Sequence, residues 1–301
     1  MPTLFCFGLG YCAAHYVAEF GARFDRIAGT VRTREKAAAI AASRFGGHAV
    51  EAFVFDGHEA APEIAAALMD ADAVLVSVPP HENGDPALTQ CAEAIAGAPH
   101  LRSAVYLSTV GVYGDHGGSW VDETTPPSPI SDRSRARLEA EQAWAALGQR
   151  AGKAVAILRL AGIYGPGQNA LTQVARGTAR RIDRPGQVFN RIHVGDIAQA
   201  IDAAFARQAA GIFNVTDDKP TPQGEPIAFA ADLLGRVPPP EIPYTEAAKT
   251  MSPMARSFYG ESKRVRNDKI KRELGVRLRY PTYREGLRAL FDAEGGALRS
   301  V

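Results

Sequence analysis

The chain has 301 residues, a formal net charge of +1 and 46% apolar residues, which are ordinary values for a globular protein. It has no block of basic residues, so neither nucleic acid nor an anionic membrane is expected as a partner. The three cysteines and seven histidines show no metal-ligand spacing, so no metal site is expected. No apolar stretch is long enough to span a membrane and no signal peptide is evident, which favours the cytoplasm.

A glycine-rich turn lies close to the start of the chain, between a predicted buried strand at Leu4 to Phe7 and a predicted helix at Ala13 to Phe20. In such a turn the first glycine allows a tight bend, and the second lets a pyrophosphate approach the backbone. The N–H groups at the N-terminus of the following helix attract an anion. The turn therefore predicts a dinucleotide site, whose expected contacts here are Gly8, Gly10, Tyr11 and Cys12.

The second predicted strand, Arg26 to Arg32, ends in a basic residue about 20 residues beyond the turn. An acidic residue at this place would bind the ribose hydroxyls of NAD, whereas a guanidinium favours the 2′-phosphate of NADP. Arg32, with Arg34 as a helper, therefore predicts NADP, and NAD is the alternative cofactor. Because the chain has 27 arginines and 7 lysines, a solvated arginine at a strand end is the other interpretation.

Strands and helices alternate through the first half of the chain, which predicts an α/β fold with a doubly wound parallel sheet. The further predicted strands are Ala49 to Phe55, Ala73 to Val78, Ala104 to Leu107, Ala154 to Leu160 and Ile212 to Val215. One predicted helix begins after the N-cap Thr33, and the others are about Pro62 to Met69, Pro86 to Ala96 and Ser131 to Gln149.

From Gly162 onward prolines and glycines become frequent, which indicates a smaller, irregular lobe over the carboxyl edge of the sheet. We therefore predict a dinucleotide-binding Rossmann domain formed by residues 1–163 plus about 188–215. The predicted substrate-binding lobe consists of about residues 164–187 plus 216–301.

The segment Tyr106 to Gly114, in which Ser-Thr follows a strand and precedes Val-Tyr-Gly, resembles the extended short-chain dehydrogenase/reductases. That family includes the nucleotide-sugar epimerases and dehydratases. Later stretches resemble it in the same order: Asp122 to Pro127, Leu158 to Gly167, Arg191 to Ala198, Asn267 to Gly275 and Tyr280-Pro281. The resemblance implies an NAD(P) cofactor and a small polar substrate. It adds five expected cofactor contacts: Asp56, Ser77, Pro79, Ser108 and Ile163.

In that family a Ser or Thr after the fifth strand polarises the substrate oxygen, which implies this role for Thr109. A Tyr-x-x-x-Lys motif then supplies the acid/base and holds the nicotinamide ribose. Here Arg133 and Arg137 occupy the two positions, so the motif is missing. Because the pKa of arginine lies far above neutral pH, its neutral form costs about 8 kcal/mol at pH 7, and Arg133 cannot act as the acid/base. Arg137 can still donate to ribose hydroxyls.

The two arginines are four residues apart on one helix face, where they could grip a phosphate or a carboxylate. A solvated helix that pairs them with Glu139 and Glu141 is the alternative. Tyr113 and Tyr164 are candidate substitute proton donors, or else packed tyrosines.

One motif and two single residues farther along the chain complete the set of candidates. A second Tyr-x-x-x-Lys, Tyr259 to Lys263, lies in the wrong part of the chain and is interpreted as coincidence. His193 is expected to be structural, and Asp196 is expected to cap the next helix.

Two functions stay open. One is an NADP-preferring oxidoreductase or epimerase-like enzyme with an altered active site, in which Thr109 polarises an oxygen and Arg133 or Arg137 holds an anionic group. The other is a non-catalytic NADP(H)-binding sensor or interaction protein on the same fold. The resemblance also implies a homodimer formed through the helices at 86–96 and 131–149.

Overall fold

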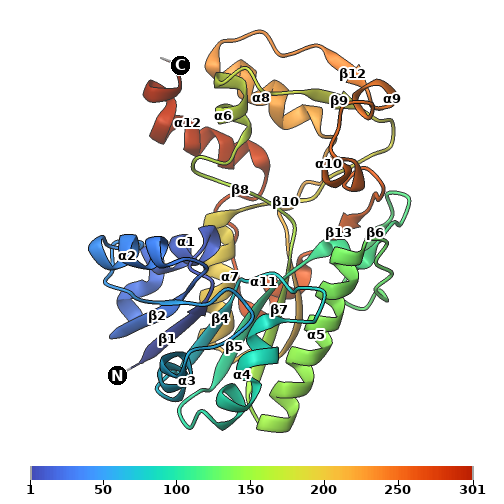
Figure 1. Ribbon diagram of the computed structural model, residues 1–301. Helices are drawn as coiled ribbons and strands as arrows, with labels where there is room; N and C mark the ends of the chain where they lie inside the picture. The colour runs from blue at the N-terminus through green and yellow to red at the C-terminus, as the bar shows by residue number, and fades with distance from the viewer. Residues whose placement is uncertain (1, 300–301) are drawn as a thin grey trace.

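The computed structural model describes residues 2–299 and contains a seven-stranded parallel sheet (Figure 1). The strands follow the order β11-β7-β5-β4-β1-β2-β3. Their bounds are Thr3–Phe7 (β1), Arg26–Val31 (β2), Glu51–Val54 (β3), Ala73–Val76 (β4), Ser103–Thr109 (β5), Ala154–Leu160 (β7) and Gly211–Val215 (β11). The sheet grows in one direction from β1 to β3 and in the other from β4 onward, and a crevice opens where the order reverses. The predicted fold class is confirmed.

Helices cover both faces of the sheet (Figure 1). On one face α1 (Tyr11–Phe20), α7 (Val194–Ala206) and α11 (Asp268–Leu274) pack into one apolar core. On the other face α3 (Pro62–Met69), α4 (Pro86–Gly97) and α5 (Asp132–Ala151) pack into a second core. Strands buried on both sides read as continuous apolar runs, which is why β1, fully buried along its length, could be recognised in the sequence. Helix α2 (Arg34–Ala42) follows β2.

Parallel pairing brings the carboxyl ends of the strands to one edge. Phe7 of β1 lies opposite Val76 of β4, and Thr109 of β5 lies opposite Leu160 of β7. The glycine turn, the end of β4 and the end of β5 therefore open onto the same edge of the sheet.

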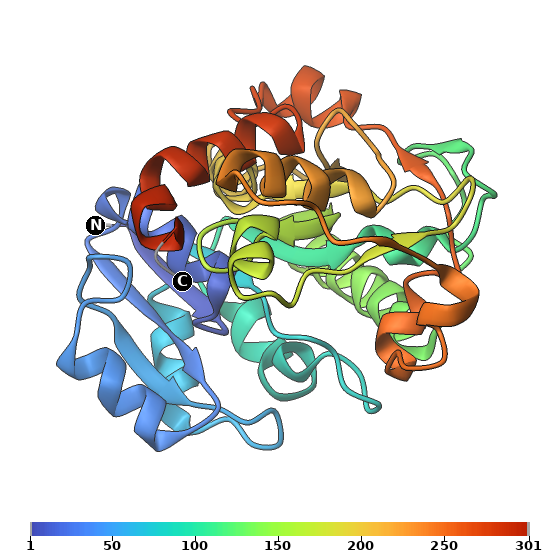
Figure 2. The same ribbon diagram turned by 90° about the horizontal axis from the view of Figure 1, so that it is seen from above.

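A small lobe lies over this edge (Figures 1 and 2). Helices α6 (Ala170–Ala175), α8 (Gly224–Leu234) and α12 (Tyr283–Arg299) pack around a separate apolar core. Both views place the segment that carries α10 (Pro253–Ser257) beside α5. The domain boundaries given above stay a prediction.

Short elements complete the lobe and its junction with the sheet. Three pairs of two or three residues form small parallel sheets: β8 (Gly162–Tyr164) with β10 (Arg191–His193), β9 (Arg181–Asp183) with β12 (Glu241–Pro243), and β6 (Trp120–Val121) with β13 (Arg264–Val265). The remaining helical turns are α9 (Tyr244–Ala247), η1 (Gly21–Arg23) and η2 (Val110–Tyr113).

The prediction that Asp196 caps the helix after β10 is wrong. The N-cap of α7 is His193, whose Nδ1 accepts a hydrogen bond from the Gly195 N–H at 3.1 Å. Asp196 lies inside the first turn, where its carboxylate accepts the backbone N–H groups of Arg279 (2.7 Å) and Tyr280 (3.1 Å). His193 therefore has a structural role, as predicted, and Asp196 attaches the segment before α12 to α7.

Candidate active site

The glycine turn is held rigidly against its neighbours. Gly8 has φ = +92°, and a Cβ atom there would lie 2.9 Å from the Ser77 Oγ and 3.0 Å from the Val78 Cγ1. Ser77 donates a hydrogen bond to the Gly8 carbonyl at 2.7 Å, and the Gly8 N–H donates to the Thr30 Oγ1 at 2.9 Å. Only glycine fits at this position, because both the backbone angle and the space exclude a side chain.

Gly10 has a different role. It is the N-cap of α1, where no side chain caps the helix, and a Cβ atom there would meet no atom within 4 Å. The positive end of α1 therefore faces open space, an arrangement that fits the diphosphate of a dinucleotide.

A cavity of about 380 Å³ lies on the β2 side of this turn. Arg32, Thr33 and Lys36 line it from the end of β2 and the first turn of α2, and Asp56 lines it from the end of β3. Arg34, expected as the helper of Arg32, is not among the lining residues, whereas Lys36 is. Two exposed cations beside a helix N-cap are a donor set suited to a ribose 2′-phosphate.

A second cavity, of about 320 Å³, continues from the first, and the two share Gly10 and Ser77. All ten predicted cofactor contacts line one cavity or the other. Gly8, Gly10, Arg32, Asp56, Ser77 and Pro79 line the first; Gly10, Tyr11, Cys12, Ser77, Ser108 and Ile163 line the second. The structure therefore brings these residues together along one path, and their contact with a cofactor stays a prediction.

Arg137 lines the second cavity and is fixed to the strand ends. Its Nη1 donates to the Leu107 carbonyl at 2.8 Å, the Tyr106 hydroxyl at 3.1 Å and the Val78 carbonyl at 3.4 Å. All three bonds come from one nitrogen. Within residues 2–299, Nε and Nη2 have no hydrogen bond, so they are the donors that a ribose could use.

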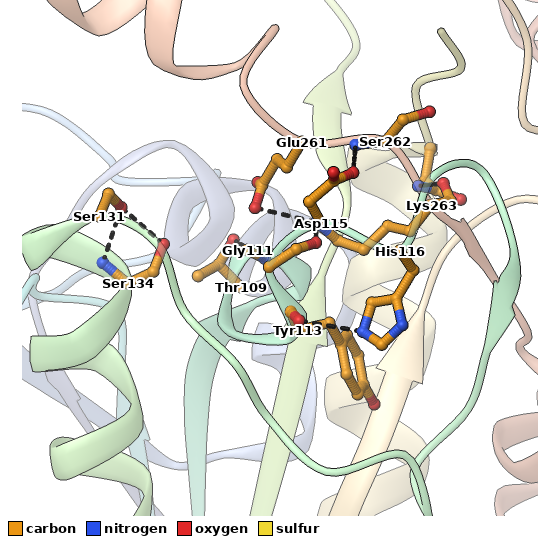
Figure 3. A network of polar contacts seen from close by, with 12 residues as sticks. Thr109, Gly111, Tyr113, Asp115, His116, Ser131, Ser134, Glu261, Ser262 and Lys263 are labelled. Carbon is orange, nitrogen blue, oxygen red and sulfur yellow. Dashed lines mark hydrogen bonds and ion pairs between the residues drawn. The ribbon is translucent and has the colours of Figure 1, made fainter. Parts of the chain in front are cut away.

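Thr109 stands where the second cavity meets a third, of about 300 Å³, since it lines both. Its Oγ1 accepts the Gly111 N–H at 3.1 Å, which orients the hydroxyl and leaves its hydrogen free to donate (Figure 3). This geometry is suited to polarising a substrate oxygen, as the family resemblance implied.

Arg133 lines the third cavity, where its exposed guanidinium lies 5.0 Å over the Phe258 ring. The two arginines therefore face different cavities: Arg137 lines the second and Arg133 the third, beyond Thr109. Among the described residues neither arginine pairs with Glu139 or Glu141, so the solvated-helix alternative does not describe this face.

Neither substitute tyrosine reaches Thr109. The buried Tyr113 donates its hydroxyl hydrogen to the Asn214 Oδ1 at 2.8 Å. The Tyr164 hydroxyl contacts the Thr282 carbonyl at 3.5 Å, and burial raises its pKa. Neither residue lines the second or the third cavity, so both are packed tyrosines.

A buried ion pair lies next to the strand end that carries Thr109. The Arg159 Nη2 lies 2.7 Å from the Glu141 Oε2, and the two side chains are 1% and 2% exposed. Ser108 donates to the Glu141 Oε1 at 2.5 Å, and the Arg159 guanidinium lies 4.7 Å over the Tyr113 ring. The pair thus ties α5 to the ends of β5 and β7.

Sequence reasoning missed two residues of the third cavity, Glu261 and Lys263. Lys263 belongs to the second Tyr-x-x-x-Lys, and that motif was the one signal available. Its tyrosine, Tyr259, is buried between Phe189 and Tyr244, with ring centroids 5.1 and 5.0 Å away, and does not line the cavity. This second Tyr-x-x-x-Lys match is therefore not a functional tyrosine–lysine pair, although its lysine lines the third cavity.

Two features are absent from the described residues. Between residues 2 and 299 no three His, Cys, Asp or Glu side chains are grouped to hold a metal ion. Across the same residues, no helix has the length and apolar character needed to cross a membrane.

The comparisons with known proteins give the family. A model of the NAD dependent epimerase/dehydratase family matches residues 87–216. Protein YeeZ of Escherichia coli (strain K12) is 30% identical over 221 residues, which are 71% of this chain and 74% of that protein. This chain belongs to the NAD-dependent epimerase/dehydratase family. The glycine turn at Gly8 and Gly10, together with the family, supports an NAD(P)-binding function of the epimerase or reductase kind.

Two further proteins are similar. A functionally unknown conserved protein from Silicibacter pomeroyi DSS has a solved structure that is 45% identical, with a TM-score of 0.85 over 98% of this chain and 100% of that one. The 3-diazoavenalumate denitrifying reductase of a Streptomyces species is 30% identical over 141 residues, 44% of this chain and 45% of that protein.

Proposed function

We propose that the protein is an NADP(H)-preferring oxidoreductase that acts on a small polar substrate carrying an anionic group. The observation that carries this proposal is the continuous path of three cavities. It leads from the basic end of β2, past the N-terminus of α1, to a chamber in which Thr109 and Arg133 face a ligand. Arg133 stands where this family places its phenol, so a residue other than Arg133 has to transfer the proton in either an oxidoreductase or an epimerase.

The cofactor would lie along the first two cavities. Arg32 and Lys36 would hold the 2′-phosphate, the uncapped N-terminus of α1 the diphosphate, and the free donors of Arg137 the nicotinamide ribose. When bound, the nicotinamide supplies or accepts the hydride. The name of the partial Streptomyces relative, a reductase, supports the same class of reaction.

The protein itself would orient the substrate. The Thr109 hydroxyl would donate to the oxygen of the reacting carbon, and the Arg133 guanidinium, stacked on Phe258, would bind the anionic group. Both residues line one chamber of about 300 Å³, a size suited to a small molecule.

The cofactor preference is the first test. The wild-type protein should bind NADPH with micromolar or better affinity, and Arg32→Glu should lower the NADPH-over-NADH affinity ratio at least about tenfold. Calorimetry with both cofactors measures this ratio. Arg34→Glu is the matched control, since Arg34 is equally exposed and does not line the cavity. An unchanged ratio in Arg32→Glu would refute the phosphate assignment.

A non-catalytic NADP(H) sensor is the second candidate, favoured by the guanidinium of Arg133 in place of the phenol. The two functions are separated by following NADPH absorbance with a panel of carbonyl compounds and nucleotide sugars. Turnover by the wild-type protein that disappears in Thr109→Ala would defeat the sensor function. An Arg133→Tyr variant, run in parallel, tests whether restoring the phenol alters the rate.

A further inference from the structure

A carboxylate–ammonium pair lies in the same chamber as Thr109 (Figure 3). The Lys263 Nζ lies 3.2 Å from the Glu261 Oε2 and donates to the Gly114 carbonyl at 2.9 Å. The Lys263 side chain is 5% exposed and that of Glu261 17%, so the carboxylate is the member nearer the open chamber. Figure 3 shows the Glu261 side chain reaching from the C-terminal segment toward Thr109 and Gly111.

The backbone that carries the pair is firmly held. The Ser262 N–H donates to the Asp115 Oδ1 at 2.8 Å, and the Ser262 carbonyl accepts the N–H groups of His116 (3.0 Å) and Gly118 (2.9 Å). The β13–β6 pairing follows directly, with Arg264 opposite Trp120. A side chain on such a clamped segment keeps its position within the chamber, as an acid/base group must.

The surroundings of Glu261 suit proton transfer. Burial raises the pKa of its carboxyl, which Asp115 also raises, whereas Lys263 and Arg133 pull that pKa down. Burial lowers the pKa of Lys263. The Glu261 Oε2 is buried and accepts no hydrogen bond within the described part of the chain, apart from its ion pair with Lys263. Because the two groups are in contact, the protonation of each depends on the charge of the other, and a general acid/base works best when its pKa lies near the working pH.

We propose that Glu261 is the acid/base residue of this site and that Lys263 is its positioning residue. The two would replace the phenol and the ammonium that the family places on α5, and the inference rests on the oxidoreductase function proposed above. No other carboxylate lines the chamber within residues 2–299, and Arg133 cannot release a proton at neutral pH.

The step balances as follows for a carbonyl substrate. The carbonyl carbon gains a C–H bond from the hydride of the reduced nicotinamide, the C=O π bond breaks, and the oxygen held by Thr109 takes the proton of Glu261. The cofactor is oxidised, and Glu261 is left as a carboxylate that the Lys263 ammonium stabilises at 3.2 Å. Solvent then returns the proton. In the oxidative direction Glu261 accepts the hydroxyl proton instead.

The first test needs no turnover. Carboxyl carbons of ¹³C-glutamate-labelled protein are titrated by NMR, and Glu261→Gln identifies the resonance of Glu261. We expect Glu261 to titrate above the ordinary range of a glutamate, because burial raises its pKa, and Lys263→Met to raise its midpoint further, because the paired cation is lost. A Glu261 that titrates at or below the ordinary range overturns the inference, whichever substrates the protein accepts.

The second test follows NADPH oxidation with two anionic carbonyl probes, 4-carboxybenzaldehyde and phenylglyoxylate. Glu261→Gln can still accept from Lys263, so the variant should fold and bind NADPH within twofold of wild type, and kcat should fall about 100-fold or more. Glu261→Asp should keep part of the rate and its pH dependence. Glu246→Gln is the matched control, an exposed carboxylate in α9 that does not line the chamber.

The outcomes separate the two proposals. A Glu261→Gln rate within threefold of wild type overturns the acid/base assignment and leaves the oxidoreductase function standing. Failure of the wild-type protein to bind NADPH, or to reduce either probe when loaded with it, overturns the proposed function and the inference with it.

Discussion

The cofactor side and the substrate side of this site consist of different kinds of chemical group. The cofactor side consists of glycines, a helix N-terminus and strand-end hydroxyls, and its cations, Arg32 and Lys36, are exposed. The substrate side contains ionisable groups removed from water, among them Glu261 and Lys263. Backbone shape and exposed cations therefore determine what binds on the first side, and buried charges determine it on the second. Substitutions should follow that division.

The largest expected effect concerns the buried ion pair of Arg159 and Glu141, which lies behind Thr109. Arg159→Met leaves Glu141 buried without its cation, and we expect a loss of about 3–5 kcal/mol in the free energy of unfolding. Chemical denaturation measures this loss.

Two controls sharpen that result. Arg150→Met breaks the exposed pair with Glu93, where the side chains are 64% and 94% exposed, and should cost less than about 1 kcal/mol. The double variant Glu141→Leu/Arg159→Met should be more stable than Arg159→Met alone, because no unpaired charge stays buried. A double variant less stable than the single one would show that the pair does more than neutralise itself.

The next effect tests the role of backbone shape on the cofactor side. Gly8→Ala should lose about 1–3 kcal/mol of unfolding free energy, since its φ is +92° and its Cβ would press on Ser77. Gly10→Ala should keep full stability, because nothing lies within 4 Å of its Cβ, yet lose about tenfold in NADPH affinity. Thermal unfolding and calorimetry on the same samples separate the two losses. Equal stability loss in both variants would contradict the division of roles between the glycines.

A smaller effect concerns pH. Asp217, which follows β11 and is 1% exposed, has its pKa raised to about 7 by burial. Since this folded-state pKa lies above that of the unfolded chain, Asp217 favours folding fully below about pH 4, and this contribution is lost as the pH rises toward 7. We expect about 1–2 kcal/mol of the stability difference between pH 5 and pH 7 to disappear in Asp217→Asn.

The quantity to compare is the slope of the unfolding free energy against pH. Unfolding free energy is measured by urea denaturation at several pH values, so any constant cost of the asparagine cancels. Arg32→Gln, on the cofactor side, is the control and should leave the slope unchanged because Arg32 is exposed. An equal slope in Asp217→Asn and wild type would mean that the carboxyl titrates normally.

The sequence was sufficient for the sheet because its long strands are buried on both faces and its helices begin at recognisable caps such as Thr33. The small sheets of the lobe escaped notice because strands of two or three residues, such as Trp120–Val121, carry no readable alternation. β4 ends at Val76 rather than Val78, since pairing stops before the two prolines that follow.

The candidate site divides in the same way. The cofactor residues could be predicted because they follow strand ends or a glycine turn, where short sequence windows determine position. Lys36 was missed although it lies in the first turn of α2, three residues after the N-cap Thr33 and close to Arg32 in the sequence. Glu261 could not be found, because its place beside Thr109 depends on bonds such as Lys263 to Gly114, which are 149 positions apart.

The clamp at Ser262 also bears on how this protein could acquire new substrates. It attaches residues 261–265 to the loop at 115–121 through two backbone hydrogen bonds to the Ser262 carbonyl, one hydrogen bond from the Ser262 N–H to the Asp115 side chain and one short strand pair, with no bond to the glycine turn. This segment of the chamber wall can thus be exchanged while the residues of the glycine turn stay unchanged. Grafting this segment between relatives offers a route to altered selectivity, with one coenzyme serving many different chambers.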